Sequence, residues 1–235
     1  MAQARYDVVA DLYVAGWSDA CDDPATAALL GLVGRVDGLR VLDVACGHGR
    51  VARELAWRGA QVTGVDISRR LLDVAEQAEQ SSPLGIEYQW TDLATGVLPG
   101  VGGFDLAVCT FGLSDIDDLD RALTAVTCAL RTGGRFVLSI VHPCFPGAGT
   151  VSGSWPPNRP YSFEGRWTAS GAESSLRRRV GANHRMLSTY LNALVGHGLR
   201  LDATIEPDPP DEWTASSRAD AARLPVFLVL AATKT

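Results

Sequence analysis

The 235-residue sequence predicts an α/β protein built on a doubly wound, mostly parallel sheet. Between residues 39 and 141, short apolar segments of strand length alternate five times with helical segments. A turn with two glycines, Cys46 to Arg50, directly follows the first apolar segment, and acidic residues end or follow three of these segments. In a parallel sheet of this kind, ligands bind at the carboxyl ends of the strands.

The positions of the apolar residues predict the individual elements. We expect helices at residues 3–15, from Pro24 onward, and at 50–58, 69–80, 119–130 and 185–197, with strands at 39–44, 61–66, 86–90, 104–110, 135–141, 199–205 and 226–231. The connection between the last two strands contains Pro207, Pro209 and Pro210 and shows no convincing helical pattern. Strands joined without a crossover helix pair antiparallel, so we expect seven strands with an antiparallel last strand.

The composition argues against several classes of partner. The formal net charge is −6, whereas nucleic acids and anionic membranes are bound by basic surfaces. The five cysteines include no Cys-x-x-Cys pair, so we expect neither a disulfide framework nor a metal site. No apolar signal segment follows Met1, and the apolar segment 225–232 is too short to span a bilayer. We therefore expect a cytoplasmic protein with no membrane partner, and the sequence leaves its oligomeric state open.

Three acidic residues stand in register at the ends of successive strands: Asp43, Asp66 and Asp92. One such acid alone is more often a helix cap or a loop charge, but three together predict a shared ligand site. Asp66 could accept hydrogen bonds from both hydroxyls of a ribose. Asp92 could accept one from the amino group of an adenine held between Ile67 and Leu93. An acid at Asp43 would repel a pyrophosphate but would suit a ligand that carries a positive amino group.

The segment Leu42-Asp43-Val44-Ala45-Cys46-Gly47-His48-Gly49 resembles the first motif of class I S-adenosylmethionine (SAM)-dependent methyltransferases, although that family usually has glycine where Ala45 stands. Residues 104–111 and 130–135 also resemble the family's pattern, with Thr132 where proline is common, so the resemblance covers about residues 35–141. It implies a Rossmann-like fold, SAM as the methyl donor and S-adenosyl-L-homocysteine (SAH) as the product. The cofactor-binding residues that we expect are Asp43, Ala45, Gly47, Gly49, Asp66, Ile67, Asp92, Leu93 and Thr110.

Further segments bear on the acceptor. Residues 139–145 and 184–190 resemble bacterial small-molecule methyltransferases of this class, and residues 110–113 lack the Asn-Pro-Pro-Tyr type of loop found in enzymes that methylate nucleic-acid amino groups. The resemblance therefore implies a small-molecule acceptor and not DNA. Tyr6 and Tyr13 are either core residues of the first helix or, as in similar enzymes, part of a lid over the donor.

Residues 142–184 break the regular alternation. Prolines and large aromatic residues in a stretch without periodicity indicate a functional segment and argue against disorder. We divide the chain into a helical lid (1–34), a SAM-binding core (35–141), a substrate cap (142–184) and the C-terminal part of the sheet (185–235). The expected acceptor-binding residues are Phe111, Trp155, Tyr161, Phe163, Trp167 and Tyr190. The run 177–179 of three arginines is expected to be a solvated face, although it could grip a carboxylate or phosphate.

A hydroxyl or protonated amine acceptor must lose a proton, and neutral histidine is suited to take it. His142 follows the fifth strand, so we expect it at the carboxyl edge beside the donor, and His184 would approach the same edge from the cap. A structural role is the alternative for each of them.

Two other functions remain open. The segment Gly47 to Ala52 satisfies the loose G-x-G-x-x-(G/A) pattern of an NAD(P)-dependent oxidoreductase, although Asp43 and Asp92 have no place in a dinucleotide site. A SAM-binding protein of the same fold that transfers no methyl group is also compatible with the sequence, because fold does not fix function.

Overall fold

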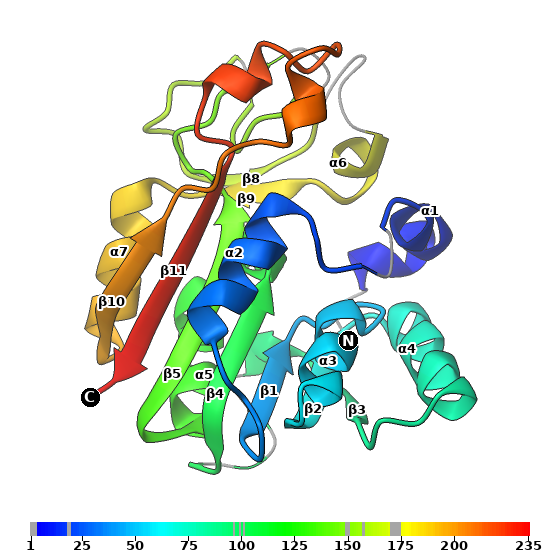
Figure 1. The fold of residues 1–235 in the computed structure, drawn as a ribbon. Helices are drawn as coiled ribbons and strands as arrows, with labels where there is room; N and C mark the ends of the chain where they lie inside the picture. The colour runs from blue at the N-terminus through cyan, green and yellow to red at the C-terminus, as the bar shows by residue number, and fades with distance from the viewer. Residues whose placement is uncertain are drawn as a thin grey trace.

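The computed structural model describes residues 4–17, 20–95, 97–98, 100, 102–148, 151–156, 158–169 and 175–235, without the side chains of Ser152 and Ser175. Its centre is a seven-stranded sheet in the order β10-β11-β5-β4-β1-β2-β3 (Figure 1). The strands are β1 Arg40–Val44, β2 Gln61–Asp66, β3 Glu87–Trp90, β4 Phe104–Thr110, β5 Leu130–Val141, β10 Leu199–Ile205 and β11 Phe227–Lys234. Strands β1 to β5 pair in parallel, and β11 pairs antiparallel with both β5 and β10. The predicted sheet and its antiparallel last strand are confirmed.

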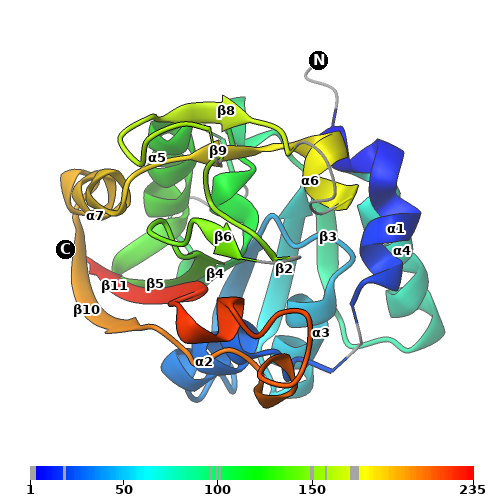
Figure 2. The ribbon, with the colours of Figure 1, turned by 90° about the horizontal axis from the view of Figure 1, so that it is seen from above.

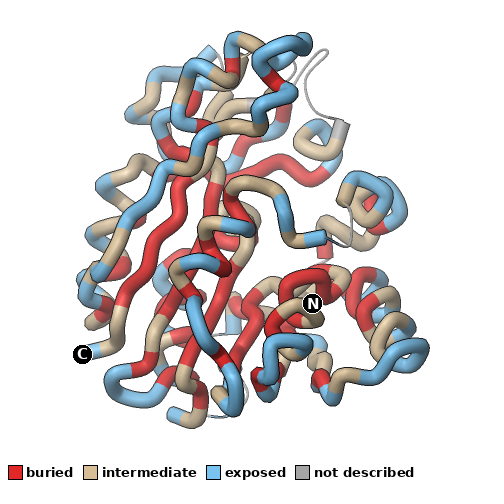
Figure 3. Tube along the Cα trace, in the orientation of Figure 1, coloured by how far each residue is buried: buried red, intermediate tan, exposed pale blue. Residues whose placement is uncertain are grey.

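Helices cover both faces of the sheet. Helices α2 (Pro24–Val33) and α3 (Arg50–Trp57) pack on one face, and α5 (Leu119–Ala129) and α7 (Leu187–Gly196) pack on the other, while α4 (Arg69–Ser81) lies against β2 and β3. Alternate residues of β4 and β5 enter the two apolar clusters, which is why the central strands are buried almost throughout (Figure 3).

Polar side chains cap the first turns of three helices. Asp23 accepts a hydrogen bond from the Thr26 amide ahead of Pro24, and Ser68 accepts one from the Leu71 amide at the start of α4. Asp118 caps α5 in the same way. Each cap satisfies a backbone amide that has no partner inside the first turn of its helix.

Two elements differ from the prediction. The expected first helix is a 3₁₀ helix, η1 (Arg5–Val9), followed by a short α1 (Ala10–Ala15). Strand β5 begins at Leu130 and not at Arg135, because Leu130 already pairs with Phe104 before a register shift. Gly133 adopts φ +74° inside this irregular part of the strand.

The predicted cap carries short elements of its own. Strands β6 (Gly147–Ala148) and β7 (Val151–Ser152) pair antiparallel, as do β8 (Gly165–Trp167) and β9 (Ala182–His184), and α6 (Ser175–Val180) lies between β8 and β9 in the chain. The 206–226 connection adds the 3₁₀ helices η4 (Asp211–Trp213) and η5 (Ala221–Arg223). Seen from above, both segments lie over the carboxyl ends of the strands (Figure 2). The cap is thus built from two parts of the chain, whereas the sequence predicted one.

No helix among the described residues is long and apolar enough to cross a membrane. The described residues also contain no group of three or more His, Cys, Asp or Glu side chains that could hold a metal ion.

Candidate functional site

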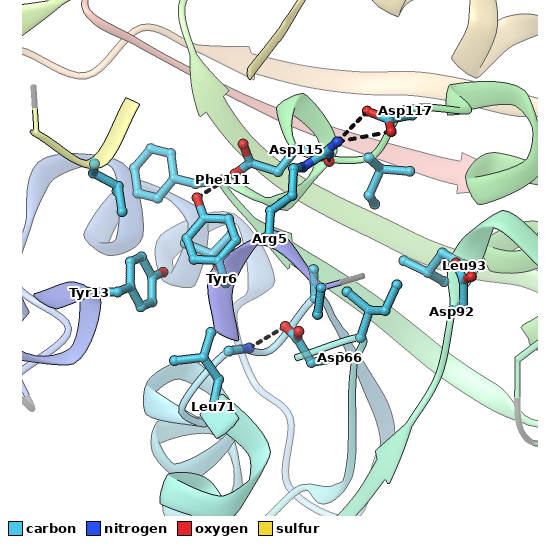
Figure 4. Close-up of a pocket in the computed structure, with 18 of the residues that line it drawn as sticks. Arg5, Tyr6, Tyr13, Asp66, Leu71, Asp92, Leu93, Phe111, Asp115 and Asp117 are labelled. Carbon is cyan, nitrogen blue, oxygen red and sulfur yellow. Dashed lines mark hydrogen bonds and ion pairs between the residues drawn. The ribbon is translucent and has the colours of Figure 1, made fainter. Parts of the chain in front are cut away.

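A cavity of about 340 Å³ lies at the carboxyl ends of β1, β2, β3 and β4 (Figure 4). Its remaining walls come from η1, α1, α6, the start of β11 and residues 110–117, which include the 3₁₀ helix η3 (Gly112–Ser114). Most of the expected cofactor residues, together with Phe111, line this cavity: Tyr6, Tyr13, Ala45, Gly47, Asp66, Ile67, Asp92, Leu93 and Thr110.

The turn after β1 has a left-handed backbone at three positions, with φ 56° at Ala45, 58° at Gly47 and 83° at Gly49. Glycine adopts this conformation freely, whereas for alanine it costs roughly 1 kcal/mol of free energy. Ala45 and Gly47 line the cavity, but Gly49 does not. A Cβ at Gly49 would lie 2.3 Å from Tyr88 Oη, so this glycine is needed for packing against β3 and not for contact with a ligand.

Asp66 ends β2, and its carboxylate forms part of the cavity wall. Oδ2 accepts a hydrogen bond from the Gly47 amide and Oδ1 accepts one from the Ser68 amide, each at 2.8 Å. Burial raises the pKa of Asp66 to about 6, although hydrogen bonds from the Ser68, Gly47 and Ile67 amides oppose the shift. Each carboxylate oxygen has two lone pairs, so Asp66 can accept further hydrogen bonds from a ligand.

Asp92 follows β3. It caps a short helix and also lines the cavity. Its Oδ1 accepts a hydrogen bond from the Ala94 amide at 2.9 Å, at the start of the 3₁₀ helix η2 (Leu93–Thr95). The residue also lines the cavity, beside the apolar side chains of Ile67 and Leu93. An acceptor next to apolar groups suits a planar ring that carries an amino group.

Asp43 is only 1% exposed and does not line the large cavity. It lines a second cavity of about 30 Å³, which shares Ala45, Thr110 and Phe111 with the first. Asp43 Oδ2 and Thr110 Oγ1 are buried there without a hydrogen-bond partner among the described residues. Burial, and secondly the charge of Asp66, raise the pKa of Asp43 to about 8. Because a buried unpaired acceptor costs free energy, a ligand that donates from a positive amino group fits this recess.

Tyr6 and Tyr13 stand in the cavity wall, with ring centroids 5.1 Å apart in an edge-to-face arrangement. Burial raises the pKa of both hydroxyls, so each stays neutral at physiological pH. Their position agrees with the lid alternative, because they face the cavity and not the sheet (Figure 4).

Asp115 joins three parts of the chain above the cavity. It accepts a hydrogen bond from Tyr6 Oη at 2.8 Å and forms an ion pair with Arg177 of α6. Arg5 pairs with Asp117 at 2.9 Å and also donates to the Asp115 carbonyl. Arg177 is therefore part of the cavity wall and not of a solvated face, whereas the adjacent Arg178 and Arg179 are exposed as expected.

His142 does not lie beside the expected donor site. Val141 lines the cavity, and the next residue turns away from it, because successive side chains leave a strand on opposite sides. His142 Nδ1 accepts a hydrogen bond from the Cys144 amide at 3.0 Å, and Nε2 lies 2.9 Å from the Glu206 carboxylate, with poor hydrogen-bond geometry. The lone pair of Nδ1 accepts the Cys144 hydrogen bond, and Nε2 faces Glu206. The imidazole therefore has no lone pair directed at the cavity. His142 is therefore absent from the cavity wall, and its expected role as the base stays a prediction.

His184 is also directed elsewhere. Its Nε2 lies 2.8 Å from the Tyr161 carbonyl, and its ring is 5.4 Å from that of Trp155. It lies outside the cavity wall, so neither predicted base lines the cavity.

Of the expected acceptor-binding residues, only one lines the cavity. Phe111 lines the cavity, but Trp155, Tyr161, Phe163 and Trp167 do not. They pack within the cap: Trp155 and Tyr161 contact each other at 5.4 Å, and Trp167 Nε1 donates to the Ser154 carbonyl. Tyr190 is buried beneath Arg185 and faces a smaller cavity. Trp167 is buried inside the cap, whereas Trp155, Tyr161 and Phe163 are only partly buried there.

Two aromatic residues that the prediction missed meet Phe111 instead. Trp17 stacks on it and Phe227 packs against it, each with ring centroids 5.9 Å away. The spacing of Trp17, four residues after Tyr13, was a usable helical signal. No local signal identifies Phe227, because β11 reaches the cavity only through its pairing with β5.

The model of a methyltransferase domain matches residues 41–134. An S-adenosylmethionine-dependent methyltransferase from Mesorhizobium loti superimposes with a TM-score of 0.73 at 31% identity, over 91% of this chain and 99% of that one. The [4+2]-cyclase SpnF shares the fold, with a TM-score of 0.67 at 20% identity over 97% of this chain and 94% of its own.

Among the curated proteins, a ubiquinone biosynthesis O-methyltransferase of Coxiella burnetii is 34% identical over 108 residues, which are 46% of each protein. The match thus spans about half the length of such relatives. The match to the Mesorhizobium loti protein covers nearly all of both chains. The chain belongs to the S-adenosylmethionine-dependent methyltransferase family.

Proposed function

We propose that the protein transfers the methyl group of SAM to a small molecule with an apolar or aromatic body. The observation that carries this proposal is the composition of the large cavity. Strand-end acids suited to a nucleoside, Asp66 and Asp92, share this cavity with an aromatic end formed by Phe111 and Phe227. One chamber could therefore hold a donor and an acceptor side by side.

The residues at the sheet edge fit the donor. Asp66 would accept hydrogen bonds from the ribose, and Asp92 from the adenine amino group, beside Ile67 and Leu93. The unpaired Asp43 Oδ2 and Thr110 Oγ1 fit the amino group of the methionine part. When bound, SAM supplies a methyl group activated by its positive sulfur. An acid at Asp43 suits that ligand better than the pyrophosphate of a nicotinamide dinucleotide.

The other end of the cavity favours an apolar acceptor. Its walls include Phe111, Ile116, Val141, Leu176 and Phe227, and the nearby charges of Asp115 and Arg177 are paired with each other. The protein's contribution is to position the acceptor and to exclude water, both of which accelerate an in-line displacement. The curated relatives named O-methyltransferases favour oxygen as the accepting atom. The net charge of −6 favours a small molecule over a nucleic acid.

Two measurements test this function. Calorimetry should detect SAH binding to the purified protein and no comparable NADH binding, and Asp66→Asn should weaken SAH binding. Mass spectrometry with methyl-labelled SAM should then find label in members of a library of apolar hydroxyl compounds. NADH binding without SAH binding would reject the donor assignment. SAH binding without labelled product across the library would favour a SAM-binding protein that transfers no methyl group.

A further inference from the structure

A small polar recess of about 20 Å³ lies behind the acceptor end of the large cavity. Val141 and Arg177 line both spaces, so they form the shared wall. The other residues around the recess come from the cap, α7 and η3: Ser114, Pro143, Gly153, Ser154, Ala182, Asn183, Arg185 and Tyr190. None of these lining residues is acidic.

Arg185 gives the recess a buried positive charge. The residue is only 9% exposed, and its guanidinium donates to the carbonyls of Leu113, Ile116 and Asp117 at 2.7–3.0 Å. Among the described residues, no carboxylate lies within ion-pair distance of Arg185. Its other contact is with the neutral ring of Tyr190, so this buried cation has no opposite charge beside it and the recess favours an anion.

The second cation at the recess, Arg177, comes from the shared wall. It pairs with Asp115 on the cavity side, so the acid that balances it does not line the recess. Asn183 adds an amide at the recess, with its Nδ2 already bonded to Asp117 at 2.9 Å. Arg185 is therefore the cation at the recess that no described carboxylate balances, and Arg177, paired with Asp115, adds a second guanidinium beside it.

The volume limits which anion can fit. About 20 Å³ holds a group little larger than one water molecule, which excludes a phosphate and allows the oxygens of a carboxylate at the shared wall. The donor-end residues Gly47, Asp66 and Asp92 do not line the recess. A carboxylate bound there would lie away from the donor end and would anchor the acceptor.

We infer that the acceptor is a small apolar carboxylic acid, whose carboxylate binds between Arg177 and Arg185 while another atom receives the methyl group. This inference rests on the proposed function and specifies its substrate class. The body of the acid lies in the apolar end of the cavity, against Phe111 and Phe227, and the carboxylate fixes which atom faces the donor.

The test compares matched acids and amides on SAH-saturated protein. The probes are 3-phenylpropionate, cinnamate and cyclohexanecarboxylate, each titrated beside its primary amide by calorimetry. At least one acid should bind about tenfold more tightly than its amide, because a charge-assisted hydrogen bond is about twice as strong as a neutral one. A panel in which no acid is preferred would overturn the inference.

Two variants locate the preference. Arg185→Gln removes the charge, and Ala182→Leu fills the recess without changing any charge, so each should reduce the acid preference to less than about threefold. The control Arg179→Gln removes an equal charge from the exposed face of α6 and should retain the preference. Where Arg185→Gln does not fold, Ala182→Leu decides, and an acid preference that survives it contradicts the inference.

SAH affinity of each variant separates this inference from the proposed function. No donor-end residue lines the recess, so SAH should bind the variants as it binds the wild type. Methyl transfer to uncharged acceptors, with no preference for acids, would leave the function intact and remove only the anion site. If the wild type does not bind SAH at all, both the proposed function and the anion site are rejected.

Discussion

The hydroxyl of Tyr6 donates a hydrogen bond to Asp115 Oδ2 at 2.8 Å, across 109 positions of sequence. Asp115 also pairs with Arg177, so one carboxylate joins the N-terminal segment, the segment after β4 and the cap. These three parts enclose the cavity from above (Figure 4). The hydrogen bond therefore connects the N-terminal wall of the cavity to the wall formed by α6.

Removing this hydrogen bond should weaken donor binding. We expect Tyr6→Phe to lower SAH affinity by about 2- to 10-fold, because a neutral hydrogen bond contributes roughly 0.5–1.5 kcal/mol and the lid would close less firmly. Calorimetry on both proteins measures the change. The control is Tyr88→Phe, because Tyr88 Oη is buried without a hydrogen-bond partner among the described residues. Equal SAH affinity in Tyr6→Phe and wild type would show that the contact does not hold the lid.

Donor affinity should depend on the protonation of Asp66. Its pKa is raised to about 6, so the carboxylate that accepts the ribose hydroxyls is lost at a higher pH than for an ordinary aspartate. SAH affinity should fall as the pH decreases from 7 to 5, and Asp66→Asn should bind weakly with little pH dependence over that range. Calorimetric titrations at several pH values provide the measurement. A wild-type affinity that is constant down to pH 5 contradicts the assignment.

The buried Asp43 should make the ligand-free protein less stable at alkaline pH. Its pKa in the folded state is about 8, above the value of about 3.9 expected for an unfolded chain, so the folded state binds the proton more tightly. The free energy of unfolding should then decrease as the pH rises from about 4 to 8. Asp43→Asn should flatten this decrease and raise stability at pH 8 by at least about 1 kcal/mol.

Urea denaturation at pH 5 and pH 8 measures this effect. Asp105→Asn is the control, and it should lower the free energy of unfolding where Asp43→Asn raises it. The hydrogen bond from Arg131 lowers the pKa of Asp105, so the ionised carboxylate stabilises the fold. The stability that Asp105 contributes is present above the unfolded pKa and is lost as the pH falls through the folded value. An Asp43→Asn variant no more stable than wild type at pH 8 would show that this carboxylate is not strained by its burial.

Histidine should not act as the base. His142→Ala should keep kcat within about threefold of wild type, because neither ring nitrogen is directed at the cavity. A general base typically contributes 10²–10⁴-fold, so the two possibilities are well separated. The measurement is a pH–rate profile with an acceptor found by the labelling screen, at a temperature where the variant remains folded. His184→Ala is measured in parallel. A hundredfold loss in kcat on His142→Ala, with loss of the acid limb, would restore His142 as the base.

The sequence alone determined the sheet and two strand-end acids that line the cavity. The alternation of apolar segments predicts all seven strands, and β2, β4 and β10 begin and end at the predicted residues. Asp66 and Asp92 were found because an acid at the end of a parallel strand must lie at the ligand edge, whatever the rest of the chain does. Local patterns of period two and 3.6 carry this information.

Only the tertiary structure decided which residues complete the rest of the cavity wall. The partner of His142, Glu206, lies 64 residues further along the chain and is brought to it only by the fold. Trp155 and Trp167 have the composition expected of a binding wall, but their contacts are with His184 and Ser154 inside the cap and not with the cavity. Arg177, Asp115 and Phe227 meet at the cavity because α6, the segment after β4 and β11 converge there. Contacts between elements far apart in sequence follow from packing and charge pairing in three dimensions, and no single segment encodes them.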